Sequence, residues 1–171
     1  MSEMQKWFDR KFDLSFPVEL YPNILTRLRG TPARLEELIR AYSREILIRK
    51  QGDTWSIQEN AGHLSDLEPL WLSRLDDFVS GLEILRPADL SNRKTHEANH
   101  NANDVQDILS QFRKARALLV ERAENFDAAM YSRAALHPRL KTPLRLVDHL
   151  YFVAEHDDQH LARIWELGKI N

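Results

Sequence analysis

Two histidines, His156 and His160, stand four residues apart in a stretch whose apolar residues recur every three or four positions. In a helix, which turns about 100° per residue, two such side chains point only about 40° apart, with Cβ atoms roughly 6 Å from each other. The pair lies at the edge of the apolar arc formed by Leu146, Val153 and Ile164. Two partly buried imidazoles are not readily both protonated, so they either form hydrogen bonds within the protein or share a bound cation.

His63 is a third candidate ligand. It lies at the margin of an apolar stripe that includes Leu64, Leu67 and Trp71. It stands near the start of its predicted helix, whereas the pair stands near the end of another, and the residues alone leave the relative direction of the two helices open. Taken alone, a histidine at this position is more often structural. The chain has no cysteine, so any metal must be held by histidines and carboxylates.

The other four histidines are weaker candidates. His96 and His100 repeat the four-residue spacing, but residues 82–102 have no apolar face, so we expect a solvated loop without a metal role. His149 lies on the same arc as the pair but about 10 Å away along the helix axis, which is too far to share one ion, although it could line a pocket. His137 precedes a proline in a predicted loop and receives no role.

Carboxylates near the histidines could accept hydrogen bonds from the second ring nitrogen of each ligand. Glu59 stands one turn before His63, but helix capping is the stronger expectation for it. Asp66, Asp157 and Asp158 are further candidates, and a solvated helix face is the alternative for each of them. The sequence therefore singles out no catalytic residue.

Four long helices are predicted from apolar spacings of three and four and from the scarcity of glycine, which indicate an all-α fold. A Thr-Pro pair starts the first and the last helix, a Ser-x-x-Glu capping box starts the second, and Asn103 is the expected N-cap of the third. The predicted ranges are 31–48, 56–80, 103–126 and 142–168. Residues 82–102 form a long connection. Residues 1–30 are expected to be an N-terminal extension that packs on a bundle of residues 31–171.

Composition and charge narrow the classes of function. The net charge of −2 and the absence of a continuous basic run argue against binding to nucleic acid or to an anionic membrane surface. No apolar stretch approaches the roughly 18 residues that a membrane-spanning helix needs. The N-terminal residues carry charges where a signal peptide would be apolar, so we expect a cytoplasmic protein.

Two stretches resemble the motifs of DinB-like proteins. TWSIQENAGHLSDLE, residues 54–68, resembles the second-helix motif of that family, and LVDHLYFVAEHDDQHLARI, residues 146–164, resembles its fourth-helix motif. The resemblance implies a four-helix bundle of up-down-down-up connectivity, with the long crossover between helices two and three, so that helices two and four are antiparallel. This sequence departs from the pattern at Phe152, where many members carry a further histidine.

The resemblance also implies one divalent metal ion, nickel or zinc, held by His63, His156 and His160. It further implies a homodimer that is either a metal-dependent hydrolase of a small molecule, or a transferase or isomerase that uses the metal and a low-molecular-weight thiol. A non-catalytic, metal-stabilised interaction module is the remaining alternative. In that case Phe152, on the predicted wet side of the last helix, is a candidate contact residue.

Overall fold

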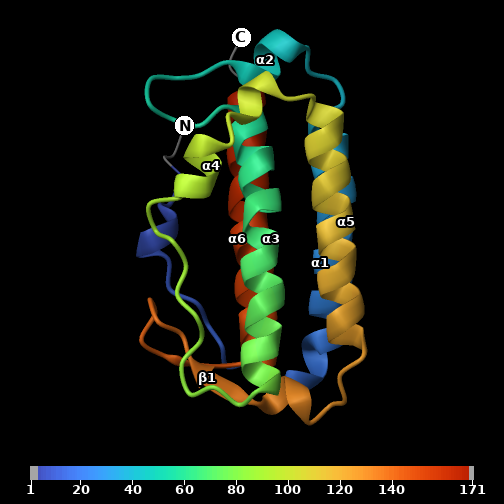
Figure 1. Cartoon of the computed structure of the whole chain (residues 1–171), viewed down its shortest axis with the longest axis vertical. Coiled ribbons are helices and arrows are strands. Elements are labelled where there is room, and N and C mark those ends of the chain that lie inside the picture. The colour runs from blue at the N-terminus through green and yellow to red at the C-terminus, as the bar shows by residue number, and fades with distance from the viewer. Residues whose placement is uncertain (1–3, 170–171) are drawn as a thin grey trace.

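The structure is a computed structural model that describes residues 4–169. Four long helices form a bundle (Figure 1): α1 (Tyr21–Ile39), α3 (Ile57–Val79), α5 (Val105–Glu124) and α6 (Leu146–Gly168). The shorter elements are η1 (Trp7–Asp9), η2 (Val18–Leu20), α2 (Arg44–Ile48), α4 (Arg93–Glu97), η3 (His100–Ala102), η4 (Met130–Ser132), β1 (Ala134–Leu136) and β2 (Pro143–Arg145). The predicted four-helix bundle is confirmed, with the addition of a small two-stranded hairpin before α6. Within the described residues, no helix combines the length and the apolar character needed to cross a membrane.

The packing and the directions of the long helices bring the start of α3 close to the end of α6. α1 and α3 each pack against both α5 and α6. In Figure 1, α3 and α5 both run from the end of the bundle at α2 to the end at β1, whereas α6 runs back from the β1 end to the C-terminus. The connection between α3 and α5, which contains α4 and η3, returns along the length of the bundle.

The start of α3 follows the predicted capping box. Ser56 Oγ accepts a hydrogen bond from the backbone N–H of Glu59 at 3.0 Å, and the Glu59 carboxylate accepts one from the Ser56 N–H at 2.7 Å. Two backbone donors at the helix start are satisfied in this way. The helix ends shortly before Gly81, whose φ of +68° suits the predicted stop.

The predicted start of the first helix at residue 31 is wrong. α1 begins at Tyr21, with Pro22 in its first turn, and Pro32 lies inside the helix. A proline lacks the N–H that would bond the carbonyl four residues earlier. That carbonyl, of Leu28, instead accepts a hydrogen bond from Arg116 Nη1 at 3.2 Å, which compensates for the missing donor. The predicted boundary after residue 30 therefore falls inside α1, and residues 44–48 form the separate helix α2.

Two further helix starts differ from the prediction by a few residues. Asp104, rather than Asn103, caps α5, and its carboxylate accepts a hydrogen bond from the Gln106 N–H at 2.8 Å. The predicted fourth-helix start at residues 142–143 lies instead in the β1–β2 hairpin, where Ala134 pairs with Arg145. α6 begins only after this pairing ends, because the same backbone groups cannot serve a strand ladder and a helix.

A buried polar network joins all four long helices and lies between two apolar clusters of the core. Arg116 of α5 donates to Glu68 of α3 at 2.6 Å and to Asp157 of α6 at 2.5 Å. Thr31 Oγ1 of α1 donates to the same Asp157 carboxylate at 2.9 Å. These side chains are at most 2% exposed, so the two carboxylates depend on Arg116 for their counter-charge.

Candidate metal centre

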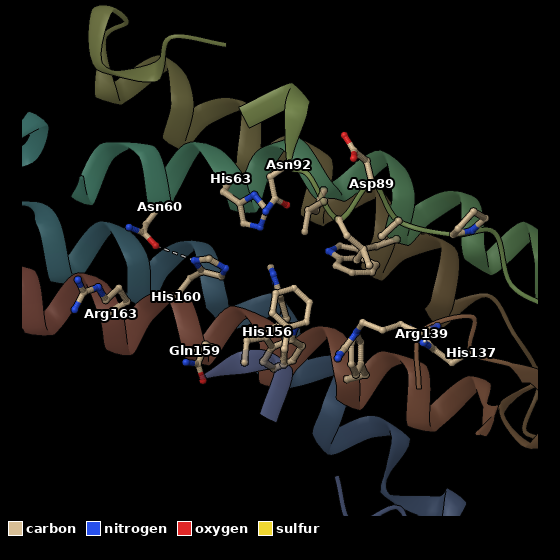
Figure 2. Close-up of a pocket in the computed structure, with 18 of the residues that line it drawn as sticks. Asn60, His63, Asp89, Asn92, His137, Arg139, His156, Gln159, His160 and Arg163 are labelled. Atoms are coloured by element: carbon tan, nitrogen blue, oxygen red, sulfur yellow. Dashed lines mark hydrogen bonds between the residues drawn. The ribbon is translucent and has the colours of Figure 1, made fainter. Parts of the chain in front are cut away.

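Three histidine side chains from two helices meet in the bundle. His63 of α3 and the α6 pair, His156 and His160, point towards one another in Figure 2. Each offers one nitrogen atom, and these nitrogens all lie within 4.8 Å of one another. The ring centroids are 5.3 Å apart for His63 and His156, 4.7 Å for His63 and His160, and 4.6 Å for His156 and His160.

A hydrogen-bond relay fixes the protonation of His63. Its Nδ1 lies 3.0 Å from Thr95 Oγ1, and the Thr95 hydroxyl donates to the Asp66 carboxylate at 2.9 Å. Because the single hydroxyl proton of Thr95 is directed to Asp66, His63 Nδ1 must be the donor in its own bond to Thr95. The lone pair of His63 therefore lies on Nε2. Orientation of a ring through its second nitrogen is typical of histidines that bind metals.

His160 is oriented in the same way by Asn60. Its Nδ1 lies 2.9 Å from Asn60 Oδ1, as the dashed line in Figure 2 shows. The Asn60 amide nitrogen donates to the carbonyl of Ser56 at 2.8 Å, which sets the direction of the amide. The Asn60 oxygen must then accept the proton of His160 Nδ1, so the lone pair of His160 also lies on Nε2.

His156 completes the cluster without a hydrogen bond to its buried Nδ1 among the described residues. Its ring packs against Trp7 and Trp71, with centroids 5.3 Å and 5.7 Å away. A buried nitrogen without a partner is unfavourable unless it meets another polar group or an ion.

Burial keeps all three imidazoles neutral. It lowers the pKa of His63 to about 2, and the neighbouring His160 adds to the effect. Burial also holds the pKa of His156 and of His160 well below the usual range, with a further contribution from the adjacent imidazole. Three neutral imidazoles, two of them with lone pairs directed by hydrogen bonds, suit a divalent cation, so the residues present fit the predicted ion.

A cavity of about 400 Å³ opens beside the three histidines. Aromatic side chains form much of its wall, including Trp7, Trp55 and Trp71. Trp7 belongs to the N-terminal segment, whose contribution to the site was not predicted. That segment also buries Phe152, whose ring lies 5.1 Å from Trp7 and 5.2 Å from Phe12. The prediction that Phe152 is on the solvated side of the helix is therefore wrong.

The prediction for residues 82–102 is only partly correct. The segment is a long connection, but it carries α4, and the side chains of Thr95 and His100 are buried. His100 Nε2 lies 2.8 Å from the Asp66 carboxylate, which also accepts from Thr95. Gly62 makes this close packing possible, because a Cβ atom there would lie 2.3 Å from the His100 ring. His100 thus supports the surroundings of His63 and lies outside the three-histidine cluster.

Of the four candidate carboxylates, Asp66 alone is linked to the histidine cluster by a described hydrogen-bond chain. Glu59 serves the capping box and pairs with Lys50 at 3.0 Å. Asp157 belongs to the buried network of Arg116, and Asp158 pairs with Arg34 at 2.6 Å. The capping role expected of Glu59 is therefore confirmed, whereas Asp157 and Asp158 form ion pairs within the protein.

His149 is fully buried, and neither of its ring nitrogens has a hydrogen-bond partner among residues 4–169. It packs against Trp71 and Phe78 at centroid distances of 5.9 Å and 5.8 Å and does not line the cavity. Burial, reinforced by the charge of Arg74, holds the pKa of His149 well below its usual range. His137, which received no role, lines the cavity instead.

The His149→Leu variant is expected to be more stable than the wild type by about 1 kcal/mol at pH 7, because an unsatisfied buried polar group is removed. The wild type should also lose more stability below pH about 6.5, since unfolded His149 takes up a proton that the folded residue does not. Urea unfolding at pH 7 and pH 5.5 measures both effects. A variant that is less stable than the wild type and equally sensitive to acid would show that the His149 nitrogens are satisfied.

The fold and this cluster define a helical-bundle protein with three converging neutral histidines at a cavity. Residues 27–164 match the DinB superfamily, and the chain belongs to that superfamily. Its structure is similar to that of YfiT from Bacillus subtilis, described as a probable metal-dependent hydrolase with an unusual four-helix bundle topology. The two chains share 19% sequence identity with a TM-score of 0.79, and the match covers 92% of this chain and 91% of YfiT. Comparison with curated proteins gives no match.

Proposed function

We propose that this protein is a hydrolase of small molecules that depends on one divalent metal ion, nickel or zinc, held by His63, His156 and His160. One observation carries the proposal: three neutral imidazoles line a cavity, and each offers a nitrogen atom within 4.8 Å of the other two. The description of YfiT as a probable metal-dependent hydrolase supports it through the shared fold. The homodimeric state and the cytoplasmic location stay predictions.

Three protein ligands are typical of catalytic metal sites, which keep an open position, whereas structural sites are usually closed by four ligands. An ion bound there would supply Lewis acidity and lower the pKa of a water molecule towards ~7. Imidazole ligands suit both zinc and nickel.

The protein's own residues orient the ligands and shape the cavity. Thr95 and Asn60 hold the rings of His63 and His160 so that both Nε2 lone pairs are free. Trp7 and the other aromatic residues make much of the cavity wall apolar. A volume of about 400 Å³ lies within the range for small-molecule sites, which supports a small substrate. A purely structural role for the three histidines would leave such a cavity without an explanation.

The Thr95→Val variant tests the link between the ion and activity. Loss of the hydroxyl removes the acceptor for His63 Nδ1, so we expect metal affinity to fall about 10–100-fold. Hydrolysis of a panel of small esters and amides is measured at limiting and at excess zinc or nickel. Turnover should fall at limiting metal and recover at excess metal, because no group that touches the substrate is changed.

Thr54→Val is the matched control, because Thr54 Oγ1 donates to the carbonyl of Gln51 outside the cluster. It should leave both metal affinity and turnover unchanged. Turnover that is insensitive to added metal in the wild type and in both variants would refute metal-dependent hydrolysis.

A further inference from the structure

Arg139, in the loop between β1 and β2, brings a positive charge to the cavity without a carboxylate partner. Its guanidinium lies over the rings of Trp7, Phe8 and Phe152, at 5.9 Å, 5.2 Å and 5.6 Å from their centroids. Its Nη2 is buried and has no hydrogen-bond partner, and no ion pair forms at Arg139 within the part of the chain that the structure describes. Figure 2 shows this side chain on the same wall of the cavity as His156.

Arg74 of α3 brings a second buried guanidinium to the cavity. It is 1% exposed and uses Nε and Nη2 to donate to the carbonyl of Arg86, at 3.1 Å and 2.9 Å. The nearby carboxylate of Asp77 pairs with the Arg86 side chain at 2.6 Å, so it does not neutralise Arg74 directly. Burial lowers the pKa of Arg74 to about 10, and the charge of Asp77 offsets this effect only in part.

His137 presents a hydrogen-bond donor towards Arg74, where an acceptor would be expected. Its Nδ1 accepts hydrogen bonds from the backbone N–H groups of Arg139 and Leu140, at 3.3 Å and 3.2 Å. The proton of the neutral ring must then be on Nε2, which lies 3.2 Å from Arg74 Nη1. Two donors therefore face each other, and an oxygen atom that accepts from both would resolve the conflict.

A single tryptophan ring separates each of the two arginines from the histidine cluster. Trp7 contacts both Arg139 and His156, at 5.9 Å and 5.3 Å. Trp71 contacts both Arg74 and His156, at 5.4 Å and 5.7 Å. A ligand that reaches both the arginines and the cluster must therefore carry an apolar segment along these rings.

We propose that the cavity binds a small organic oxyanion, a carboxylate or a phosphate-like group, at Arg139, Arg74 and His137. An apolar segment about as long as an aromatic ring joins the oxyanion to the group that lies at His156. Binding of the oxyanion does not depend on the proposed function. Only the further step, that this ligand is the substrate, rests on it. Guanidinium groups suit both carboxylates and phosphates, since each accepts charge-assisted hydrogen bonds from the planar fork.

The test is binding of benzoate, phenylphosphonate and the neutral benzamide, followed by tryptophan fluorescence, because three of the four tryptophans line the cavity. We expect at least one of the two anions to bind about tenfold or more tightly than benzamide, since hydrogen bonds to charged groups discriminate by that order. The anion preferred distinguishes a carboxylate from a phosphate-like ligand. Equal affinity for all three probes would overturn the proposal.

Arg139→Gln should lower the affinity for the preferred anion about tenfold, to that of benzamide, while Arg139→Lys should keep most of the preference. Arg122→Gln is the matched control, because Arg122 also lies over an aromatic ring, that of Phe126 at 5.7 Å, but does not line the cavity. Unchanged anion affinity in Arg139→Gln would contradict the assignment.

A further variant separates this inference from the proposed function. In His156→Ala the anion preference should persist, because the arginines are intact. Loss of the preference in that variant would mean that the anion binds at the histidine cluster, and the oxyanion site would be rejected. If the wild type binds no nickel or zinc but shows the anion preference, the metal proposal alone is rejected.

Discussion

Replacing Arg116 with leucine is expected to lower the free energy of unfolding by about 3–5 kcal/mol, because breaking a buried ion network leaves an uncompensated charge. Arg116 is 1% exposed and is the cation between the buried carboxylates of Glu68 and Asp157. It also bonds the carbonyl of Leu28 that Pro32 leaves without a helical partner. One substitution therefore disturbs contacts to α1, α3 and α6 together.

Arg113→Leu on the same helix is the matched control. Arg113 pairs with Glu36 of α1 at 2.7 Å, but its side chain is 50% exposed, so we expect a change of about 1 kcal/mol or less. Urea unfolding followed by circular dichroism compares the two variants with the wild type. If Arg116→Leu is no less stable than Arg113→Leu, the buried network does not carry the charge balance that its geometry indicates.

Replacing His156 with alanine is expected to weaken metal binding more than 100-fold. Loss of an outer hydrogen-bond partner alone costs about 10–100-fold in affinity, and loss of a ligand should cost more. His156 is 5% exposed and offers one of the three nitrogens within 4.8 Å, so alanine at this position leaves two histidines of the cluster, His63 and His160. Competition with a chromogenic chelator measures the affinity for zinc and for nickel.

The His149→Leu variant is the control for this experiment, because His149 is another buried histidine of α6 that lies outside the cluster. It should bind metal as the wild type does. Equal loss of metal in both variants would point to a general disturbance of α6 rather than to removal of a ligand.

Local patterns account for most of what the sequence predicted correctly. The Ser56–Glu59 capping box and the paired histidines depend on residues three or four apart, and helix geometry alone brings such residues together. Helix geometry alone does not place His63 beside the pair, because their contact depends on the relative direction of α3 and α6. The resemblance to DinB-like proteins supplied that direction, and the apolar spacing could not.

The predictions that failed depended on partners distant in the sequence. Pro32 is compatible with a helix interior because Arg116 of another helix bonds the freed carbonyl. Phe152 is buried because Trp7 and Phe12 cover it, and no periodicity within α6 signals a neighbouring segment. Thr95 and His100 lie in a polar stretch, yet Asp66 draws both into the interior by hydrogen bonds.

Elemental analysis of the protein purified without a histidine tag, beside the His156→Ala variant, tests the metal assignment most directly. The expected result is about one equivalent of nickel or zinc in the wild type and almost none in the variant. The absence of metal from the wild type, with no uptake after addition of nickel or zinc, would contradict the assignment of His63, His156 and His160 as ligands.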